Sequence, residues 1–242
     1  MEQPTHNPAW SIETLPAELR EWILFHILDL PTLRSLVRAS SVIHAQYRGS
    51  RAKILRACLN AELEGFFIDV HACHRSRALK PFSTNDDVED FLDAYRACLL
   101  GPIPAVIDLL SLRMVARYHL AVARPLAQMY TTWALSNLAG ATAASGYQNT
   151  NLSRSERIRL FKAIYRNETY HNLFGHNHRG EHYQPFAEYQ ISNVFFSLFE
   201  PWDVEAIGCV DLFVRHWYDG IFDKINSQGI LNLNHGYQGK IY

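Results

Sequence analysis

The side chains most suited to chemistry in this sequence are four histidines within one short polar segment. They are His171, His176, His178 and His182, and Glu181 stands beside the last of them. Imidazoles two residues apart on a loop can share a metal ion, and a carboxylate could complete the coordination. The spacing nevertheless matches no zinc-protease or zinc-finger pattern. We therefore predict a solvated loop between helices, with no metal site and no cofactor.

Motifs of covalent and phosphoryl-transfer catalysis are absent from the sequence. There is no GxSxG elbow, no Gly-rich phosphate loop and no cysteine–histidine arrangement of a known kind. The acidic pairs Asp86–Asp87 and Glu89–Asp90 fall where the start of a helix favours negative charge, so they need no catalytic role. We expect a protein that is not an enzyme and has no catalytic residue.

Basic side chains gather between Leu30 and Asn60, a segment without Asp or Glu. The six are Arg34, Arg38, Arg48, Arg51, Lys53 and Arg56. Such a band is typical of a solvated helix face, but it could also meet an acidic protein surface or, on a helix-turn-helix, DNA. The net charge of −1 argues against a dedicated DNA binder. We predict no nucleic-acid partner.

Composition indicates a globular intracellular protein. Of the 242 residues 48% are hydrophobic, which is enough for a sizeable core. The first ten residues lack the pattern of a signal peptide, and apolar runs such as Val194–Phe199 are too short to span a bilayer. The four cysteines form no CxxC pair and suit reduced thiols. We expect a cytoplasmic or nuclear protein that does not associate with membranes.

Almost every patterned stretch repeats at helical spacing, which predicts an all-α fold. Helices are expected from Pro16, from Pro31, over 42–48 and over 51–63, because proline is favoured in the first turn. One face of the first helix is predicted to carry Leu19, Trp22, Ile23 and Ile27, at i, i+3, i+4 and i+8.

Further helices are expected over 86–100 and 105–138, with a break or kink near Arg124 caused by Pro125. The segments 64–85 and 140–152 are predicted to be rich in loops. Ser153 and Glu156 form a capping box that opens another helix. Two more helices flank 200–202. Aromatic core positions are predicted, and some of them could instead line a groove for a substrate peptide helix. They are Phe195, Phe196, Phe199, Trp202, Phe213, Trp217, Tyr218 and Phe222.

The segment from about Ile12 to Arg48 repeats a Leu-Pro pair at the start of two short apolar helices. The residues in this pattern are Leu15, Pro16, Glu18, Leu19, Ile23, Ile27, Leu30, Pro31, Leu33, Leu36, Val37, Ala39 and Ser40. In this pattern the segment resembles the F-box, a three-helix module that docks a substrate receptor onto the SKP adaptor of a cullin–RING ubiquitin ligase. The third helix departs from the family, since Tyr47 stands near the position of its usual tryptophan.

This resemblance implies both an architecture and a function. The residues that would contact the adaptor are Leu15, Pro16, Glu18, Leu19, Ile23, Leu30, Pro31 and Leu33. A three-helix F-box-like N-terminal module (11–60) would pack on a larger irregular helical domain (61–242) that binds an unknown protein substrate. The chain would then be a substrate-recruiting subunit of an SCF-type ligase, bound through the adaptor to a cullin.

Two alternatives remain open at this stage. One is a helical scaffold without any connection to ubiquitin, in which the apolar residues of the first helix are ordinary core. The other is a DNA-binding regulator built on the basic band, whose affinity would fall steeply with salt. Docking on an adaptor requires Leu15, Pro16 and Leu19 to be at least partly exposed, whereas the scaffold alternative buries them.

Overall fold

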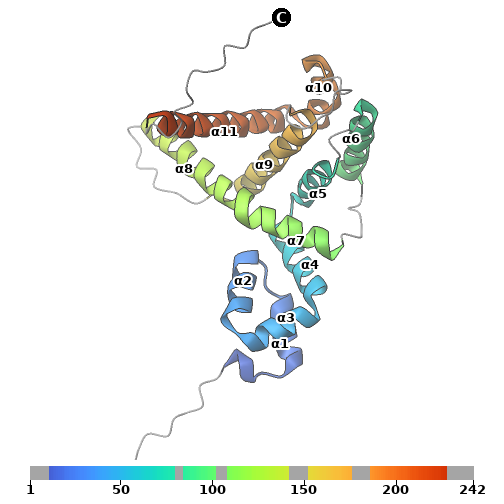
Figure 1. Cartoon of the computed structure of the whole chain (residues 1–242), viewed down its shortest axis with the longest axis vertical. Coiled ribbons are helices and arrows are strands. Elements are labelled where there is room, and N and C mark those ends of the chain that lie inside the picture. Colours follow the sequence, from blue (N-terminus) through green and yellow to red (C-terminus); the bar gives the residue numbers. More distant parts are fainter. Residues whose placement is uncertain (1–10, 80–83, 102–107, 142–151, 176–185, 228–242) are drawn as a thin grey trace, which may run out of the picture.

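The computed structural model describes residues 11–79, 84–101, 108–141, 152–175 and 186–227. These residues are mostly helical and contain no strand, which confirms the predicted all-α fold. Figure 1 shows the N-terminal helices at one end of the molecule and the long helices α8, α9 and α11 at the other. None of the described helices is both long enough and apolar enough to cross a membrane.

The N-terminal module consists of a short 3-10 turn, η1 (Ile12–Thr14), followed by α1 (Ala17–Phe25), α2 (Leu30–Ala39) and α3 (Ser41–Gly49). Side chains cap the two later helices: Asp29 Oδ1 accepts the amide of Thr32 at 2.9 Å, and Ser40 Oγ accepts the amide of Ile43 at 3.2 Å. Pro31 lies in the first turn of α2, as predicted. Local sequence therefore sets the boundaries of these helices.

Helix α4 (Arg51–Glu62) connects the module to the rest of the chain. It packs on α1 and α2 on one side and on α7 (Leu109–Tyr118) on the other. One continuous hydrophobic core runs from Leu24 of α1 through α4 to Leu112 of α7 and Tyr165 of α9 (Arg154–Phe174). The division expected between residues 60 and 61 falls inside the last turn of α4.

The prediction of a loop-rich segment over 64–85 was wrong, because α5 (Phe67–Ser76) occupies much of it. The sequence of this helix is polar, as in a loop, but its Asp69 side chain is buried. Its carboxylate accepts hydrogen bonds from Arg166 Nε at 2.7 Å and from the Tyr95 hydroxyl at 2.6 Å. Partners distant in sequence therefore stabilise a helix that its local pattern does not indicate.

Pro125 does not end the helix in which it lies. A five-residue π-helical segment, η2 (His119–Ala123), directly precedes it, and the chain then continues as α8 (Arg124–Ala141). Proline lacks an amide hydrogen, and its ring crowds the carbonyl four residues earlier, so a wider turn relieves the clash. The break or kink expected near Arg124 is therefore a local irregularity within a continuous helical region. Most of the expected linker over 140–152 lies outside the described residues.

The remaining helices pack on α5 and α9. They are α6 (Asn85–Leu100), α10 (Glu188–Val194), the turn η3 (Phe196–Leu198) and α11 (Pro201–Ser227). The capping box at Ser153 and Glu156 opens α9 as predicted. The predicted aromatic core was partly wrong, because Phe195 and Phe213 are buried whereas four others are exposed. The exposed aromatic side chains are Trp202, Trp217, Tyr218 and Phe222.

Candidate docking site

Helix α1 has an apolar side chain on each of two opposite faces. Leu24 is completely buried in the core of the module, and Ile27, just beyond the helix, is buried as well. Leu19 and Trp22 lie one turn apart on the opposite side and remain 48% and 61% exposed. Large apolar side chains that share an exposed helix face are typical of a surface that binds a partner.

The chain entering α1 is held in place by Arg20. Its Nη1 donates hydrogen bonds to the carbonyl oxygens of Glu13 at 2.8 Å and Leu15 at 2.9 Å. Pro16 is the exposed N-cap residue, and Glu18 is exposed in the first turn, where its charge favours the helix dipole. No side chain caps this end of the helix by a hydrogen bond. The start of α1 is thus an ordered and accessible surface.

The exposed indole of Trp22 is ordered by the next turn of the helix. Its ring packs on that of His26 with 4.1 Å between the ring centroids, and His26 Nδ1 lies 2.8 Å from the Trp22 carbonyl oxygen. Leu28, in the loop that follows, is also exposed. Because the rotamer of Trp22 is already restricted, a partner that covers it would lose less side-chain entropy.

The structure divides the residues that the F-box resemblance assigns to adaptor contact. Pro16, Glu18 and Leu19 are exposed and Leu15 is half-buried, and all four lie at the start of α1. Ile23 and Pro31 are half-buried as well.

Leu30 and Leu33 do not fit the assigned role. Each is only 3% exposed, because both belong to the core beneath α2. Their assignment as adaptor-contact residues is therefore corrected: both leucines support the fold of the module from its core. Trp22 is exposed together with Leu19, whereas Ile27, which the sequence pattern assigns to the same face, is buried. A helical wheel centred on Leu24 would have placed Trp22 on the opposite side.

A buried polar cluster joins the N-terminal module to η2 and α9. One oxygen of Glu62 accepts the amide of Leu30 at 3.1 Å. The other lies 2.7 Å from Arg124 Nη1 and 3.1 Å from Nε2 of the buried His119. Since a carboxylate can only accept, Nε2 of His119 carries a proton, and Nδ1 lies 2.8 Å from the Tyr165 hydroxyl.

The protonation state of Glu62 follows from this environment. Burial opposes ionisation of the carboxyl, but the hydrogen bond and charge of His119 and the charge of Arg124 outweigh it. The pKa of Glu62 is therefore lowered from its ordinary value. An ionised Glu62 fixes the position of α2 relative to η2, which keeps the module in one orientation.

The histidine cluster contains one described residue. His171 is exposed on α9, where its Nε2 lies 2.9 Å from Asp211 Oδ1 of α11. The other three histidines and Glu181 lie outside the described residues. Across the ranges that the structure describes, no three His, Cys, Asp or Glu side chains are grouped closely enough to hold a metal ion.

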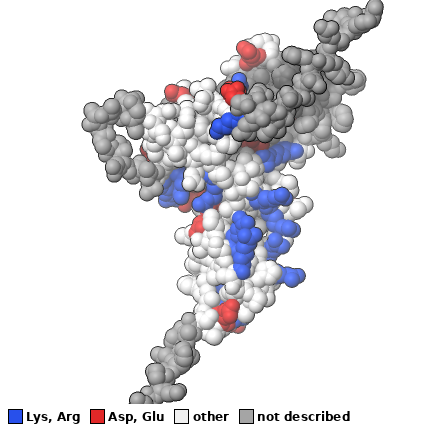
Figure 2. Space-filling view, turned by 60° about the vertical axis from the view of Figure 1, so that its left-hand side comes forward, with Lys and Arg blue, Asp and Glu red and all other residues white. Residues whose placement is uncertain are grey.

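Part of the basic band between Leu30 and Asn60 lines a groove together with arginines from elsewhere in the chain. Arg34, Arg38 and Arg51 line a groove that also receives Arg113 and Arg117 from α7. Figure 2 shows Lys and Arg side chains gathered along one face of the molecule, with few Asp and Glu among them. The two arginines of α7 are distant from this band in sequence, and only the packing of α7 on α4 brings them to the same face.

Comparison with known proteins gives no relative for this chain. No family model matches it, and neither the curated proteins nor the solved structures include a match. The resemblance to the F-box thus rests on the residue pattern of the N-terminal module. Any function assigned to the chain depends on the geometry of its own residues.

Proposed function

We propose that this chain is a substrate-recruiting subunit of an SCF-type ubiquitin ligase, docked on a SKP-type adaptor through α1. The observation that carries the proposal is the exposed apolar start of this helix. Leu19 and Trp22 remain accessible although the same helix buries Leu24 in the module. The Leu-Pro pair that begins the F-box-like pattern, Leu15–Pro16, lies beside them.

The energetics favour a partner at this surface. Burying a Leu side chain completely contributes about 1.5–3 kcal/mol, and tryptophan is enriched among the residues that dominate binding energy. Leu19 and Trp22 are together able to anchor an interface, with Pro16 and Glu18 at its edge. The scaffold alternative requires the start of α1 to be covered by the chain's own domain, and the exposure of Leu19 and Pro16 argues against it.

The proposed mechanism is positional. The N-terminal module holds the chain on the adaptor, and the helical domain holds a protein substrate near the catalytic subunits of the ligase. The gain is one of effective concentration, so no residue of this chain needs to react. The buried polar cluster around Glu62 and the continuous core through α4 suit this role, because they hold the N-terminal module and the helical domain in a fixed orientation.

Titration calorimetry of a purified SKP-type adaptor against the protein tests the proposal. The wild-type protein should bind, and Leu19→Asp or Trp22→Ala should each weaken binding by about tenfold or more, since each removes a central apolar contact. The matched controls are Leu212→Asp and Trp202→Ala, which alter exposed residues of α11.

Circular dichroism should show that all four variants keep the helical content of the wild type. A folded wild-type protein that does not bind the adaptor would refute the proposal. Equal losses of affinity in the α1 and α11 variants would also refute it, because the surface would then not be specific.

A further inference from the structure

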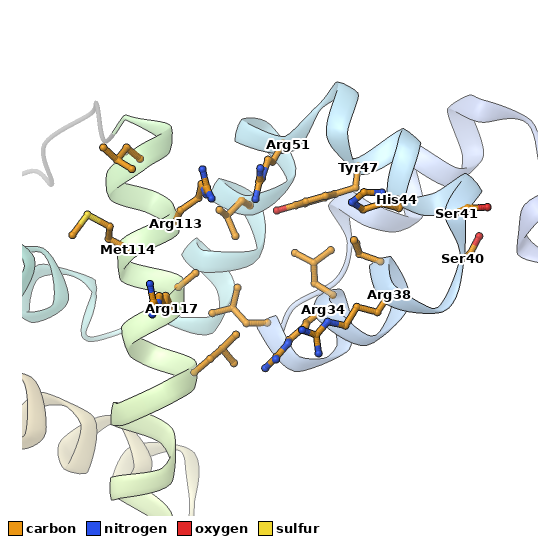
Figure 3. A pocket seen from close by; sticks show the side chains of 17 residues that line it. Arg34, Arg38, Ser40, Ser41, His44, Tyr47, Arg51, Arg113, Met114 and Arg117 are labelled. Carbon is orange, nitrogen blue, oxygen red and sulfur yellow. The ribbon is translucent and has the colours of Figure 1, made fainter.

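A groove separates α2, α3 and α4 of the N-terminal half from α7. Its volume is about 870 Å³, and five arginines line it. Arg34 and Arg38 come from α2, Arg51 from α4, and Arg113 and Arg117 from α7. Figure 3 shows these side chains around the open space between the helices. Two helices thus each contribute an arginine pair, spaced by one turn, to the same groove.

The positive charge of the groove is not neutralised by the described parts of the chain. Among the described residues, no Asp or Glu lines the groove, and none of its five arginines forms an ion pair. Arginines elsewhere differ: Arg124 pairs with Glu62, and Arg166 pairs with Asp69 and Asp203. The groove therefore concentrates unpaired positive charge in a concave surface, which attracts anions.

This arrangement opposes stability. Like charges at i, i+4 on a helix repel each other, and the groove contains two such pairs. Arg51 adds a further cost, because its Nε is buried without a hydrogen-bond partner. The Arg51 guanidinium lies over the Tyr47 ring at 5.7 Å, which holds it at the edge of the groove. A bound anion would relieve the repulsion between the exposed arginines.

The floor and rim of the groove are apolar. Leu30, Leu33 and Leu55 form its buried base. Leu110 and Met114 of α7 stand exposed at its edge. A ligand that fits the groove must therefore offer apolar side chains as well as negative charge.

We propose that the groove binds an acidic peptide segment of a partner protein, with carboxylates on the arginines and apolar side chains on the leucine floor. Arginine pairs with carboxylates through two parallel hydrogen bonds, and i, i+4 pairs on facing helices could hold an extended chain between them. Nucleic acid fits less well, because stacking needs open aromatic faces and the one tyrosine here is covered by Arg51. No residue of α1 lines the groove, so this site does not depend on adaptor docking.

Fluorescence anisotropy with a labelled synthetic peptide of alternating Glu and Leu pairs tests the proposal on the full chain. The wild-type protein should bind the peptide, more weakly as salt is raised, and should not bind a version with Gln in place of Glu. Arg113→Ala/Arg117→Ala should weaken binding by at least about tenfold, because two charge-assisted contacts are lost. Arg48→Ala/Lys53→Ala removes the same charge outside the groove and should change binding by less than about threefold.

Two further measurements distinguish peptide binding in the groove from adaptor docking through α1 and from nucleic-acid binding. Leu19→Asp should leave peptide affinity unchanged, so that failure of adaptor docking and failure of the groove remain distinguishable. Absence of peptide binding to the folded wild-type protein, or equal losses in the two double variants, would overturn the proposal. It would also be overturned if a labelled single-stranded oligonucleotide bound more tightly than the peptide and lost that binding in Arg113→Ala/Arg117→Ala.

Discussion

The buried ion pair between Asp69 of α5 and Arg166 of α9 gives a sharp prediction for stability. Asp69 is 2% exposed and Arg166 is 4% exposed, and their side chains meet at 2.7 Å. Arg166 also pairs with Asp203 of α11 at 2.8 Å, and the Tyr95 hydroxyl donates to Asp69 at 2.6 Å. The cluster thus connects four helices, α5, α6, α9 and α11.

The cost of Asp69→Ala follows from what it leaves behind. Removing one partner of a buried ion pair typically costs about 3–5 kcal/mol, because the other charge stays buried. Arg166 would keep only the partly exposed Asp203, and the buried Tyr95 hydroxyl would lose its acceptor. Tyr95→Phe should cost less, about 1 kcal/mol, because it removes one hydrogen bond and leaves the ion pair intact.

Urea unfolding followed by circular dichroism measures these differences in the free energy of unfolding. The matched control is Glu64→Ala, which breaks a pair with Arg154 in which both side chains are 66% exposed. An exposed pair of this kind contributes at most about 1 kcal/mol. If Asp69→Ala destabilised the protein no more than Glu64→Ala, the buried cluster could not be holding the four helices together. If Asp69→Ala fails to fold, the loss of unfolding free energy in Tyr95→Phe still tests the contribution of the cluster.

Three further predictions concern pH, thiols and backbone conformation. Because the folded-state pKa of Glu62 lies below its ordinary value, its contribution to stability is complete above that ordinary value and is lost as pH falls through the folded-state pKa. Glu62→Gln should remove this part of the acid dependence of the urea midpoint. Maleimide should label the exposed Cys209 in the native protein and spare Cys73, because burial raises the pKa of that thiol to about 12, and urea should abolish the difference. Gly65→Ala should cost about 1–2 kcal/mol, because φ is 89° there, whereas Gly49→Ala, with open space around it, should be nearly neutral in thermal unfolding.

Local chemistry made the helix boundaries predictable. Pro31 opens α2, and the Asp29 carboxylate caps it. Ser153 and Glu156 form their capping box at the start of α9. Such devices depend on residues within four positions of one another, so the sequence displays them directly.

Features that depend on tertiary packing could not be predicted in the same way. The sequence of α5 is polar and resembles that of a loop. The helix is stabilised by the pairing of Asp69 with Arg166, which lies 97 residues away and is not visible in the local sequence. Periodicity places Leu24 and Trp22 on opposite faces of α1, but it does not decide which of these two faces packs on the module. The arginines of α2 and α7 likewise line the same groove only because α4 packs between the module and α7.

Hydrogen exchange of the protein with and without a purified SKP-type adaptor tests the role of α1 most directly. The amides of Ala17–Phe25 are expected to exchange more slowly in the complex, because the adaptor would cover Leu19 and Trp22 and suppress opening of the helix. The exposed half of α11, with Trp217 and Phe222, should exchange at the same rate in both states. Unchanged exchange in α1 at saturating adaptor, or protection confined to α11, would contradict docking through the first helix.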